Sequence, residues 1–278
     1  MQITAPATLR YIHDRAFEGD ESLCILCPKG SEAAKFARNH GIKLQYTEDT
    51  QEESAPAAKK PAAKKKATAP SSYPASTADF TMEGGTLVKY NGGGGKVVVP
   101  NGVESIGAEA FAYCDSLTEV TLPASVLQIE NRAFYFCKNL TALSFTNGLL
   151  MVGAEAFAYC DGLTEITLPD SCEQIERNAF EGCSMLAGLD APGLVELGEN
   201  ALLYCTALSR VTLSAKLTTI GASAFGYCTS LYDLAIPASA KEIAKTACES
   251  CYLLTLHVKK NSPAAGFAKT NGIQFVEE

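Results

Sequence analysis

Seven cysteines recur along the chain at almost constant intervals of 23, 23, 23, 22, 23 and 23 residues. Spacing this regular marks repeating structural units that each contact only their neighbours, so it constrains the fold before any local motif does. The members of this cysteine ladder are Cys114, Cys137, Cys160, Cys183, Cys205, Cys228 and Cys251. The period predicts a stack of turns, each about as long as one interval.

Apolar residues keep the same period on both sides of the ladder. A large apolar residue, or Cys248 in the last turn, stands three positions before each cysteine, and a leucine stands three positions after it. The stretch LTEVTLP (residues 117–123) then alternates apolar and polar residues, which predicts a strand with one buried face, and proline ends it. One such turn cannot bury its apolar side alone, whereas stacked turns can.

Each turn reads approximately I-G-x-x-A-F-x-x-C-x-x-L-x-x-V-x-L-P, and this pattern over residues 97–278 resembles the BspA-type leucine-rich repeat family. The resemblance implies a β-rich repeat solenoid: a leucine-rich-repeat-like, right-handed solenoid with a parallel sheet, short helical turns and capped ends. It also implies a non-enzymatic binding module, active in cell-surface adhesion or in recognition of protein or glycan partners. The alternative is an intracellular scaffold for protein interactions.

The sequence divides into three parts. Residues 79–278 form the predicted array, with a hairpin cap at 79–100, repeats at 101–258 and a closing cap at 259–278. Residues 1–46 match that ending without a gap after a shift of 231 positions, so they predict a second copy of a last turn and its cap. This orphan cap is either the tail of a longer array or a module that docks elsewhere. Residues 47–78, rich in Ala, Pro and Lys, predict a disordered linker.

The closing cap has the signals of a short helix followed by a strand. Ser262 is placed as N-cap with Pro263 at the first helical position, and Asn271 and Gly272 end the helix. The glycine-rich stretch from Gly92 to Lys96 lacks the remainder of a phosphate-binding loop, so it predicts a turn, the one around which the hairpin cap folds.

Composition excludes several classes of function. The apolar runs fall far short of the roughly 20 residues that cross a membrane, so no membrane insertion is expected. Residues 79–278 hold 12 basic and 22 acidic groups, and this acidic balance disfavours nucleic acid as a partner. The amino terminus lacks the pattern of a secretory signal, so localisation stays open between the cell surface or secretion implied by the resemblance and the cytoplasm if Met1 is the true start.

The cysteines and carboxylates carry no catalytic pattern. The ladder predicts a buried column of free thiols, and Cys172, which has no repeat counterpart and lies in a predicted turn, is expected to be the exposed and reactive one. The pair Cys24 and Cys27 lies on a predicted strand and the pair Cys248 and Cys251 at core positions, so no metal site and no cofactor are expected. Glu119 and Glu165 share one outward column, which any regular solenoid produces, and we predict no enzyme.

Two surface features are the candidates for partner binding. The outward residues of successive strands should form a flat, small-residue, mildly acidic face, and the residues just before the ladder cysteines should form an aromatic column. The candidates on the face are Glu119, Thr121, Glu165, Thr167, Asp190, Arg210, Thr212 and Asp233, and those in the column are Tyr113, Tyr159, Tyr204 and Tyr227.

Overall fold

The computed structural model describes residues 2–4, 24–27, 33, 37, 42–46, 79–145 and 147–278. The chain divides into two compact units, Met1–Lys65 and Lys66–Glu278. The expected linker, residues 47–78, lies outside the described residues.

The first unit contains a small parallel sheet in the order β1-β2-β3. Its strands are β1 (Gln2–Thr4), β2 (Cys24–Cys27) and β3 (Lys43–Tyr46). Ala33 and Ala37, in helical conformation between β2 and β3, are fully buried. The Ile42 N–H donates to the Ala37 carbonyl at 2.9 Å, which ends the helical stretch and leads into β3.

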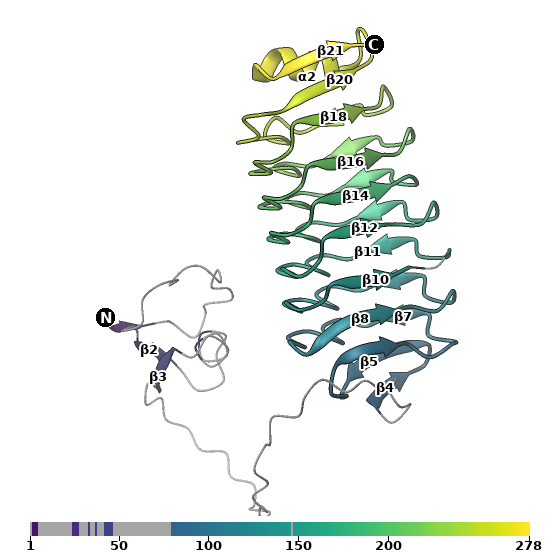
Figure 1. Ribbon diagram of the computed structural model, residues 1–278, viewed down its shortest axis with the longest axis vertical. Coiled ribbons are helices and arrows are strands. Elements are labelled where there is room, and N and C mark those ends of the chain that lie inside the picture. Colours follow the sequence, from purple (N-terminus) through teal and green to yellow (C-terminus); the bar gives the residue numbers. More distant parts are fainter. Residues whose placement is uncertain are drawn as a thin grey trace, which may run out of the picture. The chain divides into compact units, whose positions relative to one another are not determined.

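The second unit is a coil of stacked turns with strands on two sides (Figure 1). Along one side lie three short parallel sheets, in the orders β10-β8-β6, β12-β14-β16 and β18-β20-β21. We call the outward side of these sheets the sheet face. Their strands are β6 (Gly95–Val98), β8 (Leu117–Thr121), β10 (Ala142–Ser144), β12 (Glu165–Thr167), β14 (Gly188–Ala191), β16 (Arg210–Leu213), β18 (Asp233–Ile236), β20 (Thr255–Val258) and β21 (Gln274–Glu277).

Along the other side runs a nine-stranded sheet in the order β19-β17-β15-β13-β11-β9-β7-β5-β4. All of its pairs are parallel except β4 with β5. Its strands are β4 (Phe80–Glu83), β5 (Thr86–Tyr90), β7 (Ser105–Ile106), β9 (Gln128–Ile129), β11 (Met151–Val152), β13 (Gln174–Ile175), β15 (Glu196–Leu197), β17 (Thr219–Ile220) and β19 (Glu242–Ile243).

The array begins with an antiparallel hairpin, as the sequence predicts, but the hairpin turns at a different glycine pair. The turn between β4 and β5 lies at Gly84 and Gly85, and Gly84 has a left-handed φ of 60°. The glycine-rich stretch from Gly92 instead carries the chain from β5 in one sheet to β6 in the other. This stretch is a turn, as predicted, and the Gly94 N–H donates to the Tyr90 hydroxyl at 3.1 Å.

The array ends with helix α2 (Pro263–Asn271), as the sequence predicts. The Ser262 side chain accepts from the Ala265 N–H at 3.2 Å, and Gly272 stops the helix with a left-handed φ of 65°. The strand that follows, β21, then pairs in parallel with β20. An N-cap hydroxyl and a C-terminal glycine satisfy groups that a helix end leaves without partners.

The first unit has the strand order and register of this closing cap. The pairing of Cys24 with Gln2 and with Lys43 becomes, after the same shift of 231 positions, the pairing of Thr255 with Asp233 and with Gln274. The sequence match between residues 1–46 and the end of the array therefore extends to the sheets.

The sequence predicts short helical turns within the repeats, whereas the structure has hydrogen-bonded turns of another kind. We call the segment from six residues before each ladder cysteine up to that cysteine the arch. In the first arch, Glu109 and Tyr113 have left-handed φ values of 56° and 60°, and corresponding residues of the following arches repeat this. Such a conformation costs an ordinary residue roughly 1 to 2 kcal/mol.

Main-chain hydrogen bonds to the next arch offset that cost. The N–H groups of Glu109, Phe111 and Tyr113 donate to carbonyls of the next arch at 3.2, 2.8 and 2.8 Å. The left-handed residues turn alternate N–H groups to the same side, so that each arch presents a row of donors to its neighbour. The same triple recurs between the later arches up to the one that ends at Cys228.

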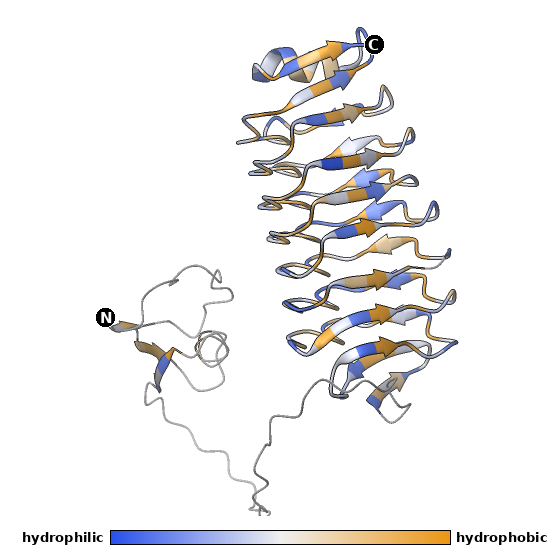
Figure 2. Ribbon diagram, viewed as in Figure 1, coloured by the Kyte–Doolittle hydropathy of each residue, from blue (hydrophilic) through white to orange (hydrophobic). Residues whose placement is uncertain are grey.

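The core consists of columns, one residue from each turn. Phe111, Phe134, Phe157 and Phe180 stack with ring centroids 4.8, 5.0 and 5.2 Å apart, and each ring is almost fully buried. Figure 2 shows hydrophobic and hydrophilic residues alternating along the strands, which is why one side of each turn faces this core. Burial of each such side chain contributes about 1.5 to 3 kcal/mol.

Candidate functional site

The sheet face aligns the predicted candidates in two columns. Glu165 pairs with Gly188 and Gly188 with Arg210, whereas Thr167 pairs with Asp190 and Asp190 with Thr212. Neighbouring strands lie about 4.8 Å apart, so each column presents side chains at that interval. Among the candidates on this face, Asp190 and Glu119 are half-buried and the others are exposed, namely Thr121, Glu165, Thr167, Arg210, Thr212 and Asp233.

Charged residues of this face form ion pairs within the face. Glu119 lies 2.8 Å from Lys96 on the preceding strand, and Glu165 lies 2.6 Å from Arg210. Asp233 lies 2.9 Å from His257. The sequence predicts a mildly acidic face, and these pairs neutralise three of its carboxylates.

On the sheet face, the pKa of His257 is raised by two carboxylates. Its Nε2 atom is in hydrogen-bond contact with Asp233, and its Nδ1 atom lies 3.3 Å from Glu278. The hydrogen bond to Asp233, more than that to Glu278, raises the pKa of His257 above its ordinary value, because both carboxylates favour the imidazolium.

The aromatic column is interrupted. The side chains of Tyr113, Tyr204 and Tyr227 are exposed by 42%, 37% and 39%, but Tyr159 is exposed by only 8%. The Tyr159 hydroxyl donates to Glu181 at 2.8 Å, and its ring lies over Gly182. The structure therefore offers three of the four predicted tyrosines to a partner and buries the fourth.

The exposed tyrosines of the aromatic column lie in two places. Tyr204 and Tyr227 form a pair with ring centroids 4.9 Å apart. Tyr113 contacts Tyr135 and accepts a hydrogen bond from Arg132 at 3.2 Å, and the Arg132 guanidinium also lies 4.2 Å above the Tyr135 ring. Aromatic faces with this spacing can contact a sugar ring or an apolar side chain.

The five inner ladder thiols, from Cys137 to Cys228, are buried as predicted, but Cys114 and Cys251 at the ends are half-buried. The structure also shows a hydrogen bond that the sequence did not reveal. From Cys137 onward, each Sγ donates to the carbonyl of the residue three positions before the preceding ladder cysteine, as in the 3.1 Å contact from Cys160 to Phe134. Burial raises the pKa of every ladder thiol. All eleven cysteines lie in the described part of the chain, and each is a free thiol.

The prediction that Cys172 is exposed is wrong. Cys172 is fully buried, and burial raises the pKa of its thiol to about 12. It stands twelve positions after Cys160, where other turns have buried apolar residues such as Val126 and Leu149. Counting twelve positions from each ladder cysteine would have shown that Cys172 belongs to a column of buried residues.

The described residues contain neither a cluster typical of a metal site nor a membrane-spanning helix. Within the described ranges, three or more His, Cys, Asp or Glu side chains do not gather in a group that could hold a metal ion. The described helices also include none long and apolar enough to cross a membrane.

Comparison with known proteins agrees with this geometry. A family model described as BspA type leucine-rich repeat region matches residues 93–192 and again residues 150–266. The chain belongs to the BspA-type leucine-rich repeat family. A crystal structure of a leucine-rich repeat protein from Bacteroides ovatus is 26% identical, with a TM-score of 0.56, over 64% of this chain and 52% of that one.

Two further solved structures share the repeat with lower structural agreement. A leucine-rich cell surface protein from Faecalibacterium prausnitzii is 25% identical over 66% of this chain and 59% of its own, with a TM-score of 0.39. A leucine-rich repeat protein from T. pallidum is 26% identical over 66% of this chain and 71% of its own, with a TM-score of 0.36. The chain spans about half the length of the Bacteroides ovatus protein described above. No curated protein matches it.

Proposed function

We propose that the array is a non-enzymatic binding module that recognises an extended protein or glycan along the sheet face. The observation that carries this proposal is the register of the face. Polar side chains occupy one position of the paired strands, as Thr121 and Ser144 do in one sheet and Thr167, Asp190 and Thr212 do in the next. A partner that spans several turns therefore meets a polar side chain at each of these strands, and solenoids bind extended ligands along such a surface.

The exposed tyrosines support the same proposal. Tyr204 and Tyr227 offer two adjacent rings, and partner sites are enriched in tyrosine because it buries a large area at a low entropic cost. Tyr113 lies at a separate place in the aromatic column. Tyr159 has no part in the proposed contact because the structure buries it.

The carboxylates of the face support a role in binding over one in catalysis. Glu119 contacts Lys96, and Glu165 contacts Arg210, so each of these carboxylates is already held in an ion pair of the face.

More specifically, we propose that the module acts in adhesion or recognition at the cell surface, and this part of the proposal rests on the family to which the repeats belong. The second candidate is an intracellular scaffold. Eleven free thiols favour that alternative, because proteins that fold in oxidising compartments usually pair their cysteines. Protease treatment of intact cells distinguishes the two, since a surface module is cleaved and an intracellular one is protected.

The proposal is tested by capture of partners with the full chain as bait, followed by affinity measurements on the captured protein or glycan. A double variant with Glu165→Lys and Thr167→Lys, and a second with Tyr204→Ala and Tyr227→Ala, should each weaken binding at least about tenfold. A matched control places Gln128→Lys on the nine-stranded sheet, where Gln128 is also exposed. Unchanged affinity in both double variants, with the fold retained, would exclude the sheet face and the tyrosine pair.

A further inference from the structure

The last arch of the array, which ends at Cys251, lacks a following arch to bond with. In the preceding arch, the Phe225 and Tyr227 N–H groups donate to the Ala247 and Glu249 carbonyls at 2.8 and 2.9 Å. The corresponding N–H groups of the last arch belong to Cys248 and Ser250. Within the part of the chain that the structure describes, neither of these two groups has a hydrogen-bond acceptor.

The orientation of these donors follows from the backbone. Ser250 has a left-handed φ of 58°, close to the 57° of Tyr227, so its N–H points out of the arch as that of Tyr227 does. Two donors on alternate residues therefore face the side where a further arch would lie. A ligand that brings two acceptors at this spacing can therefore bond to this edge.

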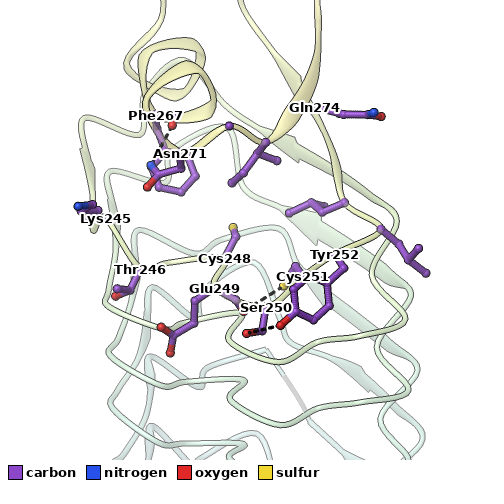
Figure 3. Close-up of a pocket in the computed structure, with 14 residues that line it drawn as sticks. Lys245, Thr246, Cys248, Glu249, Ser250, Cys251, Tyr252, Phe267, Asn271 and Gln274 are labelled. Carbon is purple, nitrogen blue, oxygen red and sulfur yellow. Dashed lines mark hydrogen bonds between the residues drawn. The ribbon is translucent and has the colours of Figure 1, made fainter.

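A pocket of about 740 Å³ lies at this edge, between the last arch and helix α2 (Figure 3). Cys248 and Ser250 line one side, and Phe267 and Asn271 of α2 line the other. The helix closes the core, since Phe267 is exposed by only 8%, but leaves this space beside the arch. The volume lies within the range of pockets that hold small ligands or short peptides.

The rim of the pocket adds apolar surface. Tyr252 and Leu253 are exposed by 84% and 66%, which makes them the most exposed large apolar residues of the described chain. Both line the pocket, and the Tyr252 hydroxyl donates to the Ser250 side chain at 3.3 Å. Large apolar residues that are grouped at the surface beside unpaired donors are typical of a binding site.

We propose that this pocket binds a short peptide segment of a partner protein, whose main chain takes the place of a further arch. The repeats themselves define the ligand. Every arch that has a successor binds carbonyls on alternate residues of that successor, so a peptide with two carbonyls at this spacing matches the Cys248 and Ser250 donors. Main-chain addition to an open edge is an established way for proteins to recognise peptides. This site is separate from the sheet face, and its test does not depend on the function proposed above.

The probe is a synthetic peptide with the sequence of residues 176–187 and Cys183→Ser. In the array, the Ala179 and Glu181 carbonyls of this segment accept from Phe157 and Tyr159 at 2.8 and 2.7 Å. Gly182 within it takes the left-handed conformation at little cost. The control peptides are a scrambled sequence and the same peptide with an ester in place of the Ala179–Phe180 amide, which weakens one acceptor carbonyl.

The measurement is amide hydrogen exchange by NMR on the full chain. In the free protein, the amides of Cys248 and Ser250 should exchange at least about tenfold faster than those of Phe225 and Tyr227. The peptide should slow exchange at these two amides, and the scrambled and ester peptides should do so less. Equal exchange rates in the free protein would show that the donors are already satisfied and would overturn the proposal.

Variants locate the site. Thr246 and Gln274 are exposed and line the pocket, so Thr246→Trp or Gln274→Trp should fill its mouth and weaken peptide binding at least about tenfold without unfolding the chain. Gln128→Trp, far along the array, is the matched control. The proposal fails if the peptide does not bind at millimolar concentration, if acetate protects the two amides as well as the peptide does, or if the pocket instead joins two copies of this chain.

Discussion

Glu165 and Arg210 form an ion pair across a strand that lies between theirs. The Glu165 carboxylate on β12 lies 2.6 Å from the Arg210 guanidinium on β16, and both side chains pass over Gly188 on β14. A Cβ atom on Gly188 would come within 2.6 Å of the guanidinium. The pair therefore depends on the absence of a side chain on the middle strand.

Gly188→Ala should uncouple this pair without unfolding the array. Exposed ion pairs couple by about 0.2 to 1 kcal/mol, and both side chains are flexible enough to move away from an added methyl group. A double-mutant cycle with Glu165→Gln and Arg210→Gln can be measured by urea unfolding. It should give this coupling energy in the natural chain and almost none in the Gly188→Ala variant. The same coupling energy in both backgrounds would contradict this account.

Tyr159 and Tyr204 should respond differently to loss of the hydroxyl. Tyr159 is buried and donates to Glu181, so Tyr159→Phe should lower the free energy of unfolding by about 1 to 3 kcal/mol. Tyr204 is exposed, so Tyr204→Phe should change it by no more than about 0.5 kcal/mol. Equal effects of the two variants in thermal or urea unfolding would show that Tyr159 is not held as described.

Cys172 should resist alkylation of the native protein, together with the buried ladder thiols Cys137, Cys160, Cys183 and Cys205. Within the array, the half-buried Cys114 and Cys251 should react first. Mass spectrometry after brief labelling with iodoacetamide gives the order. Early labelling of Cys172 would restore the interpretation from sequence and contradict its burial.

The raised pKa of Cys172 also predicts loss of stability in alkali. A thiol whose pKa is 9.0 in the unfolded chain and about 12 in the native one stabilises the fold fully below pH 9, and this contribution is lost as the pH rises toward 12. Each such thiol contributes a slope of about −1.4 kcal/mol per pH unit in that window. Urea unfolding of Cys172→Ala between pH 8 and 10.5 should show a smaller decline than that of the natural chain.

Cys160 tests the hydrogen bond of the ladder. Cys160→Ser should cost about 1 to 3 kcal/mol, because it places a hydroxyl in an apolar column. The Phe134 carbonyl lies 3.1 Å from the thiol, so serine keeps a donor that Cys160→Ala removes. We therefore expect alanine to cost at least as much as serine in urea unfolding, and a clearly milder alanine variant would show that the thiol acts through its apolar character alone.

His257 should titrate above its ordinary pKa of 6.5. Asp233→Asn should lower the pKa of His257 more than Glu278→Gln does, since the hydrogen bond to Asp233 is the larger cause. Because the folded pKa is raised, the contribution of this contact to stability is present below pH 6.5 and is lost as the pH rises through the folded pKa. NMR titration of the imidazole protons in the three proteins measures the shifts directly.

The repeat pattern predicted most of the fold because each turn meets an almost identical neighbour. A residue that recurs at one position, such as a phenylalanine of the stacked column, takes the same place in each turn. The hairpin turn lies at Gly84 and Gly85, ahead of the longer glycine run, because Gly84 takes the left-handed conformation that this tight turn needs. The left-handed backbone of the arch was not predicted. Tyrosine rarely takes this conformation, and that of Tyr113 depends on hydrogen bonds to the next turn.

The candidate surfaces were predicted less well, because exposure depends on side chains from adjacent turns. The sequence places Tyr159 and Tyr204 at equivalent positions, but Glu181 and Gly182 in the next turn draw Tyr159 inward. Similarly, Gly188 alone does not reveal that two charges meet over it. The open edge at Cys248 and Ser250 follows from counting main-chain donors in the last arch, which requires the structure.

The arch bonds join each turn only to the next one, and this has a mechanical consequence. A force that pulls the two ends of the array apart loads these bonds one pair of turns after another, since no main-chain bond of an arch reaches beyond its neighbour. Under tension the array should lengthen in a series of steps of nearly equal size, each releasing the chain of one turn, so that the module yields gradually while the remaining turns keep their shape.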